Sequence, residues 1–258
     1  MSVRGTAEIT DGDVRHSAIT SHSIGIAELD QLLQSLPPDA DTLDYRRAVV
    51  EENLLGLASE SGRVWRFKTL RRVYLLRPDS LLFRALRDLW VDDPEARPLL
   101  AALCAIATDT VFRASAIVIS GTSVEDEVTS ADFAEAVEAR YPGAYAPSSL
   151  QKIASNAYRS WEQSGHLGPA KGGRKIRRLA ACRPADVAYA LLLGHLEGHR
   201  GEALFETRWT EILDQPCSGL YELAVAASQR GMVEYRNAGG VIEVGFRELL
   251  RPMEGELL

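Results

Sequence analysis

Residues 148–178 read SSLQKIASNAYRSWEQSGHLGPAKGGRKIRR, and they decide how this chain is expected to fold. Apolar residues recur at the spacing of one helix face as far as Trp161, which predicts a helix over 148–163 with one buried stripe. The paired glycines Gly172 and Gly173 then predict a tight turn between two short strands. A helix that leads directly into such a hairpin is typical of a winged helix-turn-helix unit.

The face of this helix opposite the apolar stripe carries hydrogen-bonding side chains, none of them acidic. Such side chains can contact phosphates or base edges in a major groove. Ser148 and Gln151 also match a capping box, which predicts an ordered first turn with N–H groups available to a phosphate. The candidate DNA contacts of the helix are Ser148, Ser149, Gln151, Lys152, Ser155, Asn156 and Arg159.

The basic hairpin (residues 167–178) adds five cations to the candidate DNA contacts, namely Lys171, Arg174, Lys175, Arg177 and Arg178. Residues 148–183 hold eight cations and the single anion Glu162, although the whole chain has a net charge of −7. Each cation that meets a phosphate releases counterions, so binding through this segment would depend steeply on salt. The alternative interpretation is a solvated charged hairpin that binds nothing.

The composition favours an ordinary soluble globular protein. Of the 258 residues, 46% are hydrophobic and 25% are charged, close to the averages for that class. No apolar run approaches the roughly 20 residues that cross a bilayer, and the N-terminus has no apolar signal core, so we expect a cytoplasmic protein without membrane contact. The three cysteines are widely spaced and odd in number, which favours reduced thiols over a disulfide framework or a zinc cluster.

Helical patterns dominate the first half of the chain. Polar residues without periodicity predict a flexible tail over 1–22. Residues 23–122 predict a helical bundle domain. Its helices are expected over 25–36, 42–57, 63–76, 80–90 and 99–118, the last of them as one central buried helix.

The second half predicts two successive winged helix-turn-helix-like units. The basic unit covers 123–184 and includes a further helix over 130–141, and the second unit covers 185–258. The sequence QSGHL from Gln163 matches QRGMV from Gln229, which indicates an internal repeat. In each copy a glycine, Gly165 or Gly231, is expected just past a helix end with a positive φ. The fold class is therefore mainly α with small β-hairpins.

The second unit differs from the basic unit in charge. Helices are expected over 186–199, 205–213 and 218–229, before a hairpin that turns at Gly239 and Gly240. Its hairpin carries Arg236 between two glutamates, which would repel phosphates more than attract them. We expect this unit to contact protein rather than DNA.

Another basic group lies in the helical bundle. Lys68, Arg71 and Arg72 share one face of the expected helix 63–76 and form a second candidate phosphate-contacting patch. The alternative is that the long side chains of this helix cover apolar surface instead.

Signals for catalysis or a cofactor are weak. His195 and His199 have the i, i+4 spacing of zinc ligands, but no third ligand is evident and the H-E-x-x-H pattern is absent. The GPAKGGRK stretch lacks the spacing of a phosphate-binding loop. We therefore predict no catalytic residues, no metal and no cofactor.

Four segments together suggest a family. The order ENLLGLASESGRVWRFKTLRRVYLL, LLFRALRDLW, PSSLQKIASNAYRSWEQSGHL and GGVIEVGF resembles the BrxA proteins of BREX phage-resistance systems. The resemblance implies a small, mostly helical, non-enzymatic DNA-binding component of a bacterial defence operon. It also implies DNA contacts at Lys68, Arg71 and Arg72 and along residues 152–178.

The leading functional hypothesis is an accessory protein of a phage-defence system that binds double-stranded DNA without catalysis. Two hypotheses of other classes compete with it. One is a transcription regulator, which would need dimerisation and a defined operator. The other is a scaffold that binds other defence-system proteins. RNA is the less favoured nucleic-acid ligand.

Overall fold

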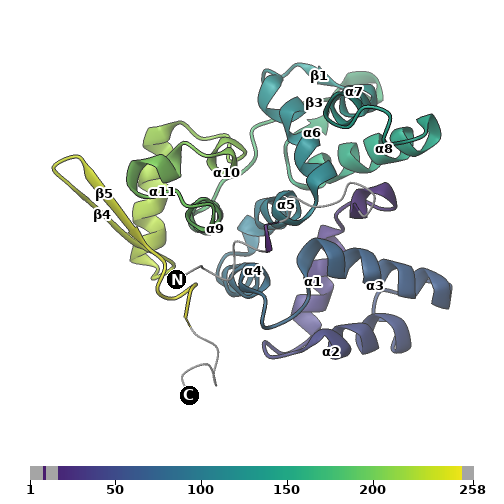
Figure 1. The fold of residues 1–258 in the computed structure, drawn as a ribbon, viewed down its shortest axis with the longest axis horizontal. Helices are drawn as coiled ribbons and strands as arrows, with labels where there is room; N and C mark the ends of the chain where they lie inside the picture. Colours follow the sequence, from purple (N-terminus) through teal and green to yellow (C-terminus); the bar gives the residue numbers. More distant parts are fainter. Residues whose placement is uncertain (1–7, 10–16, 252–258) are drawn as a thin grey trace.

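The computed structural model describes residues 8–9 and 17–251, and its first half is built from helices. In Figure 1, α1, α2 and α3 lie at the lower right, α4 and α5 in the middle, and α6 at the upper right. They are the 3₁₀ turn η3 (Ala18–Thr20), α1 (Ile26–Ser35), α2 (Thr42–Arg46) with its π-helical continuation η4 (Arg47–Glu51), α3 (Glu60–Tyr74), α4 (Leu81–Asp92), η5 (Pro94–Ala96), α5 (Arg97–Thr108) and α6 (Thr110–Gly121).

The second half alternates helices with short antiparallel strands. After α6 come β1 (Glu127–Val128), α7 (Ser130–Arg140), α8 (Pro147–Gln163), β2 (Leu167–Pro169), the tip η6 (Lys171–Gly173) and β3 (Lys175–Arg177). They are followed by α9 (Pro184–Leu196), η7 (Gly201–Phe205), α10 (Arg208–Glu211), α11 (Cys217–Gln229), β4 (Glu234–Ala238) and β5 (Val241–Gly245). A mainly helical fold with small antiparallel strand pairs is confirmed.

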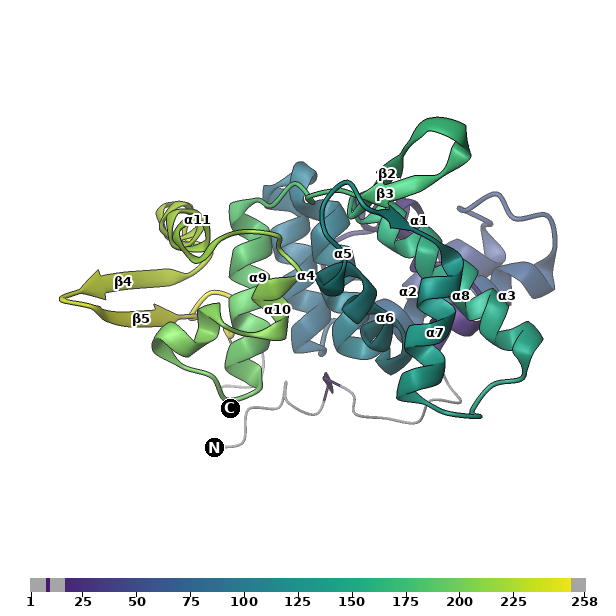
Figure 2. The same cartoon turned by 90° about the horizontal axis from the view of Figure 1, so that it is seen from above.

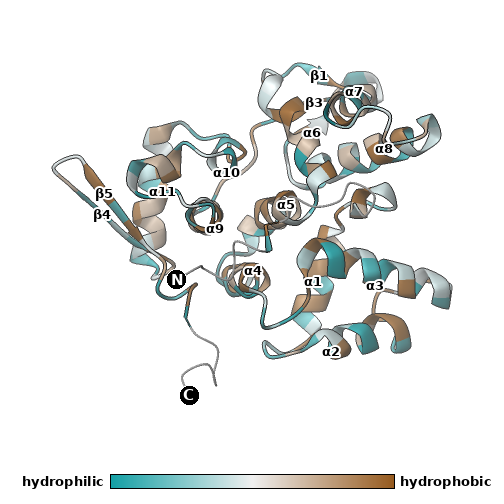
Figure 3. Ribbon diagram, in the orientation of Figure 1, coloured by the Kyte–Doolittle hydropathy of each residue, from teal (hydrophilic) through white to brown (hydrophobic). Residues whose placement is uncertain are grey.

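The core is centred on α5 and α9. Every residue of α5 from Leu99 to Ala107 is buried, and α5 packs against α3, α4, α6 and α9. Figure 3 shows α5 as a largely apolar helix in the middle of the molecule. The Tyr189 hydroxyl of α9 donates to the Leu82 carbonyl of α4 over 3.0 Å. The first and second halves of the chain therefore share one core. No helix of the described residues is long and apolar enough to cross a membrane.

The expected single helix over 99–118 is wrong, because the chain breaks at Asp109. This residue leaves the helical conformation (φ −123°, ψ 106°) and its carboxylate accepts from the N–H groups of Val111 and Phe112. The same carboxylate accepts from the Ser17 hydroxyl at 2.7 Å and from the Ala18 N–H at 2.6 Å. An aspartate that caps a helix satisfies N–H groups that would otherwise be unpaired. Asp109 therefore starts α6 and also holds the N-terminal segment.

Residues 17–22 of the expected flexible tail pack against the core, and residues 1–7 and 10–16 lie outside the described residues. Ser17, Ala18 and Ile19 are buried, and η3 packs against α3 and α8. Glu8 accepts from the N–H groups of Leu81 and Leu82 at the start of α4. A carboxylate is stabilised at a helix N-terminus. The start of α4 therefore holds Glu8 in place, although the residues around it in the sequence are polar.

Several expected helices end early. The helix expected over 42–57 ends at Glu51, and Asn53 adopts a left-handed conformation with φ 54°. The helix expected over 205–213 is reduced to α10, which Thr207 caps. Helix α9 ends at Leu196, so His199 lies beyond it and does not share its face with His195. Helix ends depend on individual caps and turns, which periodicity does not resolve.

The two copies of the repeat end their helices in the same way. Gly165 after α8 has φ 89° and Gly231 after α11 has φ 75°, as expected. In the first copy the His166 N–H donates to the Trp161 carbonyl at 3.1 Å. In the second the Met232 N–H donates to the Ala227 carbonyl at 3.0 Å. This six-to-one closure requires a left-handed residue, which glycine supplies at least cost.

Each repeat copy is followed by a hairpin, and the two hairpins lie in different sheets. Strand β3 lies between β1 and β2 in an antiparallel three-stranded sheet, and β4 pairs with β5 alone. Gly239 and Gly240 form the turn of the β4–β5 hairpin, as expected. Figure 2 shows this hairpin at one end of the molecule and the β2–β3 hairpin projecting near the other end.

Candidate nucleic-acid interface

The buried stripe of α8 is as the sequence predicts. Ile153, Ala154, Ala157 and Trp161 are buried. The Trp161 ring stacks on Phe112 of α6 with 4.8 Å between centroids, and its Nε1–H donates to the Ser115 hydroxyl at 2.8 Å. An indole that is buried and hydrogen-bonded fixes the rotation of the helix about its axis. The opposite face of α8 is consequently turned to solvent.

The start of α8 differs from the expectation. The helix begins at Pro147 with Ala146 as its N-cap, and no side chain caps it. The predicted capping box of Ser148 and Gln151 is therefore wrong. Proline is favoured at the first helical position because its φ is preset and its missing N–H would be unpaired there anyway. Ser148 and Ser149 are instead exposed in the first turn.

We define the outer face of α8 as Ser148, Lys152, Ser155 and Arg159. Lys152 and Arg159 are exposed and Ser155 is half-buried, while Gln151 is exposed at the margin of the face. Successive helical residues are turned by about 100°, so positions four and seven apart lie along one side. Among the described residues, Lys152 and Arg159 have no ion-pair partner. Both cations are free to meet an anion.

Asn156 does not belong to this face. Its Nδ2 donates to the Ile19 carbonyl at 2.8 Å, and the neighbouring Ser160 hydroxyl accepts from the Ile24 N–H at 3.1 Å. The segment that contains η3 therefore lies along one margin of α8. In this conformation the Asn156 amide group already donates to backbone, so its predicted contact with DNA would require that hydrogen bond to break.

The tip of the basic hairpin depends on glycine. Gly172 and Gly173 have φ of 78° and 76°, values that side chains other than glycine rarely adopt, and the Ala170 N–H donates to the Arg174 carbonyl at 2.8 Å. Lys171 at the tip is exposed, and no ion pair is present for it among the described residues. The tip thus presents one unpaired cation on a short turn.

Three other cations of the hairpin, exposed Arg174 and Arg178 and partly buried Lys175, are paired with carboxylates. Arg174 Nη1 lies 3.0 Å from Glu127 Oε2. Lys175 pairs with Glu162 and lies 4.6 Å from the centroid of the Tyr158 ring. Arg178 pairs with Glu125. The sequence count of charges missed Glu125 and Glu127, because these acids precede the basic segment and reach it only through the sheet.

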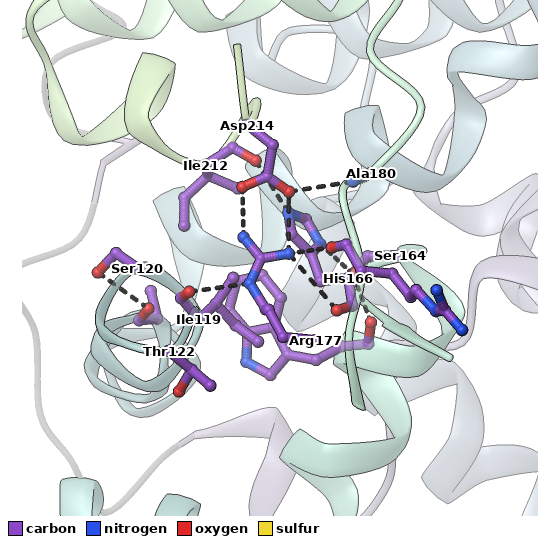
Figure 4. A network of polar contacts seen from close by, with 12 residues as sticks. Ile119, Ser120, Thr122, Ser164, His166, Arg177, Ala180, Ile212 and Asp214 are labelled. Atoms are coloured by element: carbon purple, nitrogen blue, oxygen red, sulfur yellow. Dashed lines mark hydrogen bonds and ion pairs between the residues drawn. The ribbon is translucent and has the colours of Figure 1, made fainter. Parts of the chain in front are cut away.

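Arg177 is buried within the protein, so its side chain is not exposed to the DNA that the sequence predicts it to contact. Its side chain is 4% exposed and forms a two-pronged ion pair with Asp214, which precedes α11. Its Nε also donates to the Ile119 carbonyl at 2.9 Å. Figure 4 shows the guanidinium enclosed between these partners. A buried guanidinium with all its donors engaged has nothing left for phosphate.

His166 completes the same buried network (Figure 4). Its Nδ1 lies 2.7 Å from the Ser164 hydroxyl and its Nε2 lies 2.8 Å from the Ile212 carbonyl. Burial is the main cause that lowers the pKa of His166 to about 4. The ring is therefore neutral near pH 7, and Nε2 carries the proton because a carbonyl can only accept. The network joins the basic hairpin to the loop between α10 and α11.

The second basic patch lies on α3. Lys68, Arg71 and Arg72 are exposed, and among the described residues they have no ion-pair partners. Trp65 beside them is 52% exposed, and the Lys68 ammonium lies 6.0 Å from its ring centroid. Arg66 on the opposite face is buried and pairs with Glu28. The exposed face of α3 is thus a patch of three unpaired cations and one aromatic ring.

The two sets of unpaired cations lie at the same end of the molecule. Turn η3 packs against both α3 and α8. Figures 1 and 2 both place α3 and α8 at the end of the molecule opposite the β4–β5 hairpin. A ligand with charges spread over a long surface could therefore meet both helices.

The described residues hold no cluster of three or more His, Cys, Asp or Glu side chains with metal-binding geometry. No protein-family model matches the chain, and no curated protein matches it significantly. What the surface can bind is therefore inferred from its geometry and its charge.

Proposed function

We propose that the protein binds double-stranded DNA without catalysis, with the outer face of α8 in the major groove. The observation that carries this proposal is the pair of exposed, unpaired cations Lys152 and Arg159 on a helix face that is otherwise neutral and polar. Unpaired cations bind phosphates without first giving up a carboxylate. A B-DNA major groove about 12 Å wide admits an α-helix.

The order of elements supports a winged helix-turn-helix unit. Helices α6, α7 and α8 are followed by the β2–β3 hairpin, and β1 joins this hairpin between α6 and α7. In this interpretation α8 is the recognition helix and the hairpin is the wing. Helices α9, α10 and α11 with the β4–β5 hairpin repeat the order. The second unit would then be a related module with another role.

The division of contacts follows from the chemistry of the exposed side chains. Lys152, Arg159 and Lys171 would contact phosphates, and Ser148 and Ser149 would donate hydroxyl hydrogen bonds to the backbone. Gln151 at the margin of the face is the best candidate for a base-edge contact, since an amide can bind adenine with two hydrogen bonds. With a single such side chain, sequence preference would be weak.

A phage-defence role is proposed on the resemblance to BrxA proteins of BREX systems. The segments that carry the resemblance include α3 and α8, the helices that hold the candidate phosphate-contacting cations. In that setting the protein would be an accessory DNA-binding component, and its acidic remainder would face other defence proteins.

Protein binding is a second candidate, favoured by the C-terminal hairpin. Val241 on β5 is 65% exposed and Val225 on α11 is 42% exposed. The hairpin also carries exposed Glu234 and Glu243. Exposed valines among acids suit a protein contact better than a phosphate contact. This surface is separate from α8, so both functions are compatible.

The test of the DNA proposal is a double substitution, Lys152→Glu with Arg159→Glu, measured by fluorescence anisotropy on a random-sequence duplex. Both side chains are exposed and unpaired, so the fold should be unaffected. We expect affinity to fall by on the order of tenfold or more, and the slope of log K against log salt to decrease by about 2.

The matched control is Arg236→Glu on β4 with Arg247→Glu, two residues after β5. This control changes the net charge by the same amount, and both of its side chains are exposed and distant from α8. The control should bind DNA much better than the α8 variant. Equal losses in the two variants would mean that overall charge, and not the outer face of α8, determines binding.

A further inference from the structure

Three carboxylates form ion pairs with cations of the basic hairpin. We call Glu125, Glu127 and Glu162 the acidic strip; they pair with Arg178, Arg174 and Lys175 respectively. The acids come from two separate segments, the turn before β1 with β1 itself, and the last turn of α8. Every exposed cation of the hairpin except Lys171 at the tip is paired in this way.

The sheet fixes two of these acids beside the hairpin. Strand β1 pairs antiparallel with β3 so that Glu127 is opposite Ile176, two residues after Arg174. Glu125 has a left-handed backbone with φ 76°, and its N–H donates to the Arg177 carbonyl at 2.9 Å. Non-glycine residues adopt this conformation at a cost. The backbone hydrogen bond holds the Glu125 side chain near Arg178.

The fold also positions one of the cations. A Cβ atom at Gly168 of β2 would lie 2.9 Å from Cγ of Arg178. The arginine stem therefore crosses the strand at the one position without a side chain, and its guanidinium reaches Glu125. Both partners are brought together by backbone pairing and not by sequence proximity.

A phosphate needs the same guanidinium and ammonium donors that the acidic strip occupies. The pairs of Arg174 and Arg178 are largely exposed, with side-chain exposures of 63% and 44% for the arginines. Exposed pairs are weak, about 0 to 1 kcal/mol each, so a phosphate can displace them. The displaced carboxylates stay nearby, however, and repel the incoming phosphate.

We infer that the acidic strip competes with DNA phosphates for the basic hairpin, so that the hairpin alone binds weakly and duplex binding depends on the unpaired cations of α8. This inference rests on the proposed DNA binding. The strip acts as an internal phosphate mimic. The acidic strip weakens the binding of a polyanion that contacts the hairpin alone. A ligand that contacts both the hairpin and α8 is therefore bound more tightly in comparison.

The experiment replaces Glu125→Gln with Glu127→Gln in the full chain and measures affinity for a random-sequence duplex at low salt. Glutamine keeps the size of the side chain and removes its charge. We expect about threefold to tenfold tighter binding, since two exposed pairs no longer oppose the phosphates. In the same background, Lys152→Glu with Arg159→Glu should cost less affinity than it does in the natural chain, because the hairpin can then bind by itself.

The matched control is Glu206→Gln with Glu222→Gln in the second unit, where both acids are exposed. It removes the same two charges away from the hairpin. An equal gain in affinity from the control would overturn the inference, because net charge alone would account for it. Unchanged affinity of the hairpin variant would also overturn it while leaving the DNA proposal intact. Absence of DNA binding by the natural chain and by both variants would overturn the proposed function and this inference together.

Discussion

Arg174 and Arg177 lie three residues apart in the basic hairpin and carry the same charge, yet they have opposite environments. The Arg174 side chain is 63% exposed beside Glu127, whereas that of Arg177 is 4% exposed and paired with Asp214. The sequence gives both as candidate DNA contacts. Arg177 is buried because the segment of residues 212–214 packs against it, and Asp214 in that segment lies 37 positions later in the sequence.

At this scale we predict that Arg177→Met strongly destabilises the protein. Removing one partner of a buried ion pair leaves Asp214 charged and unpaired, with a cost of about 3 to 5 kcal/mol in the free energy of unfolding. The Ile119 carbonyl would also lose the hydrogen bond from Arg177 Nε. Urea denaturation followed by circular dichroism measures the change.

Arg174→Met is the control for that prediction. Its pair with Glu127 is exposed, so the loss should be below about 1 kcal/mol. Equal stability of the two variants would mean that the Arg177–Asp214 pair is not the link between the hairpin and the C-terminal unit.

Among the elements, α8 and α3 present most of the exposed cations that have no ion-pair partner among the described residues. On α3 these cations are Lys68, Arg71 and Arg72, next to the half-exposed ring of Trp65. The outer face of α8 offers Lys152 and Arg159 on the other side of η3. If one duplex meets both helices, each helix should contribute independently to the salt dependence.

We predict that Lys68→Glu with Arg72→Glu lowers duplex affinity and reduces the slope of log K against log salt by about 2, because two phosphate contacts are lost. Anisotropy titrations at several salt concentrations measure both quantities. The Arg236→Glu, Arg247→Glu variant again serves as the matched control. An unaltered slope in the α3 variant would remove α3 from the interface and leave α8 as the contact surface.

The elements themselves could largely be predicted from the sequence. The apolar stripe of α8, the glycine turn after it and the repeated helix ending at Gly231 all follow from local patterns that determine local structure. The break at Asp109 could not be predicted, because this aspartate lies inside a continuous apolar run and caps α6 with help from residues about 90 positions earlier.

The candidate site was predictable only in part for the same reason. Lys152, Arg159 and Lys171 are exposed and unpaired among the described residues, as a charge-based interpretation requires. Asn156 and Arg177 are bound by partners that tertiary packing supplies, Ile19 and Asp214. Nothing in the local sequence of a polar residue tells whether a distant segment will cover it.

For the whole molecule, charge is distributed unevenly in space as well as in sequence. The net charge is −7, and acids reach into the basic hairpin from β1 and α8. Among the described residues, six exposed cations without an ion-pair partner lie on α3, on α8 and at the tip of the basic hairpin. Arg236 on β4, at the opposite end, is another exposed cation without such a partner. A polyanion should therefore approach the end that holds the six cations, while the remaining acidic surface repels it.

The measurement that tests this account most directly is binding of the natural chain to a random-sequence DNA duplex and a matched RNA duplex at about 50 and 200 mM salt. Six unpaired cations, on α3, on α8 and at the hairpin tip, predict about a thousandfold loss of DNA affinity over that range. RNA should bind more weakly, because its deep, narrow major groove excludes a helix. DNA binding that is absent or insensitive to salt would contradict the account, and equal binding of RNA would contradict the placement of α8 in a DNA major groove.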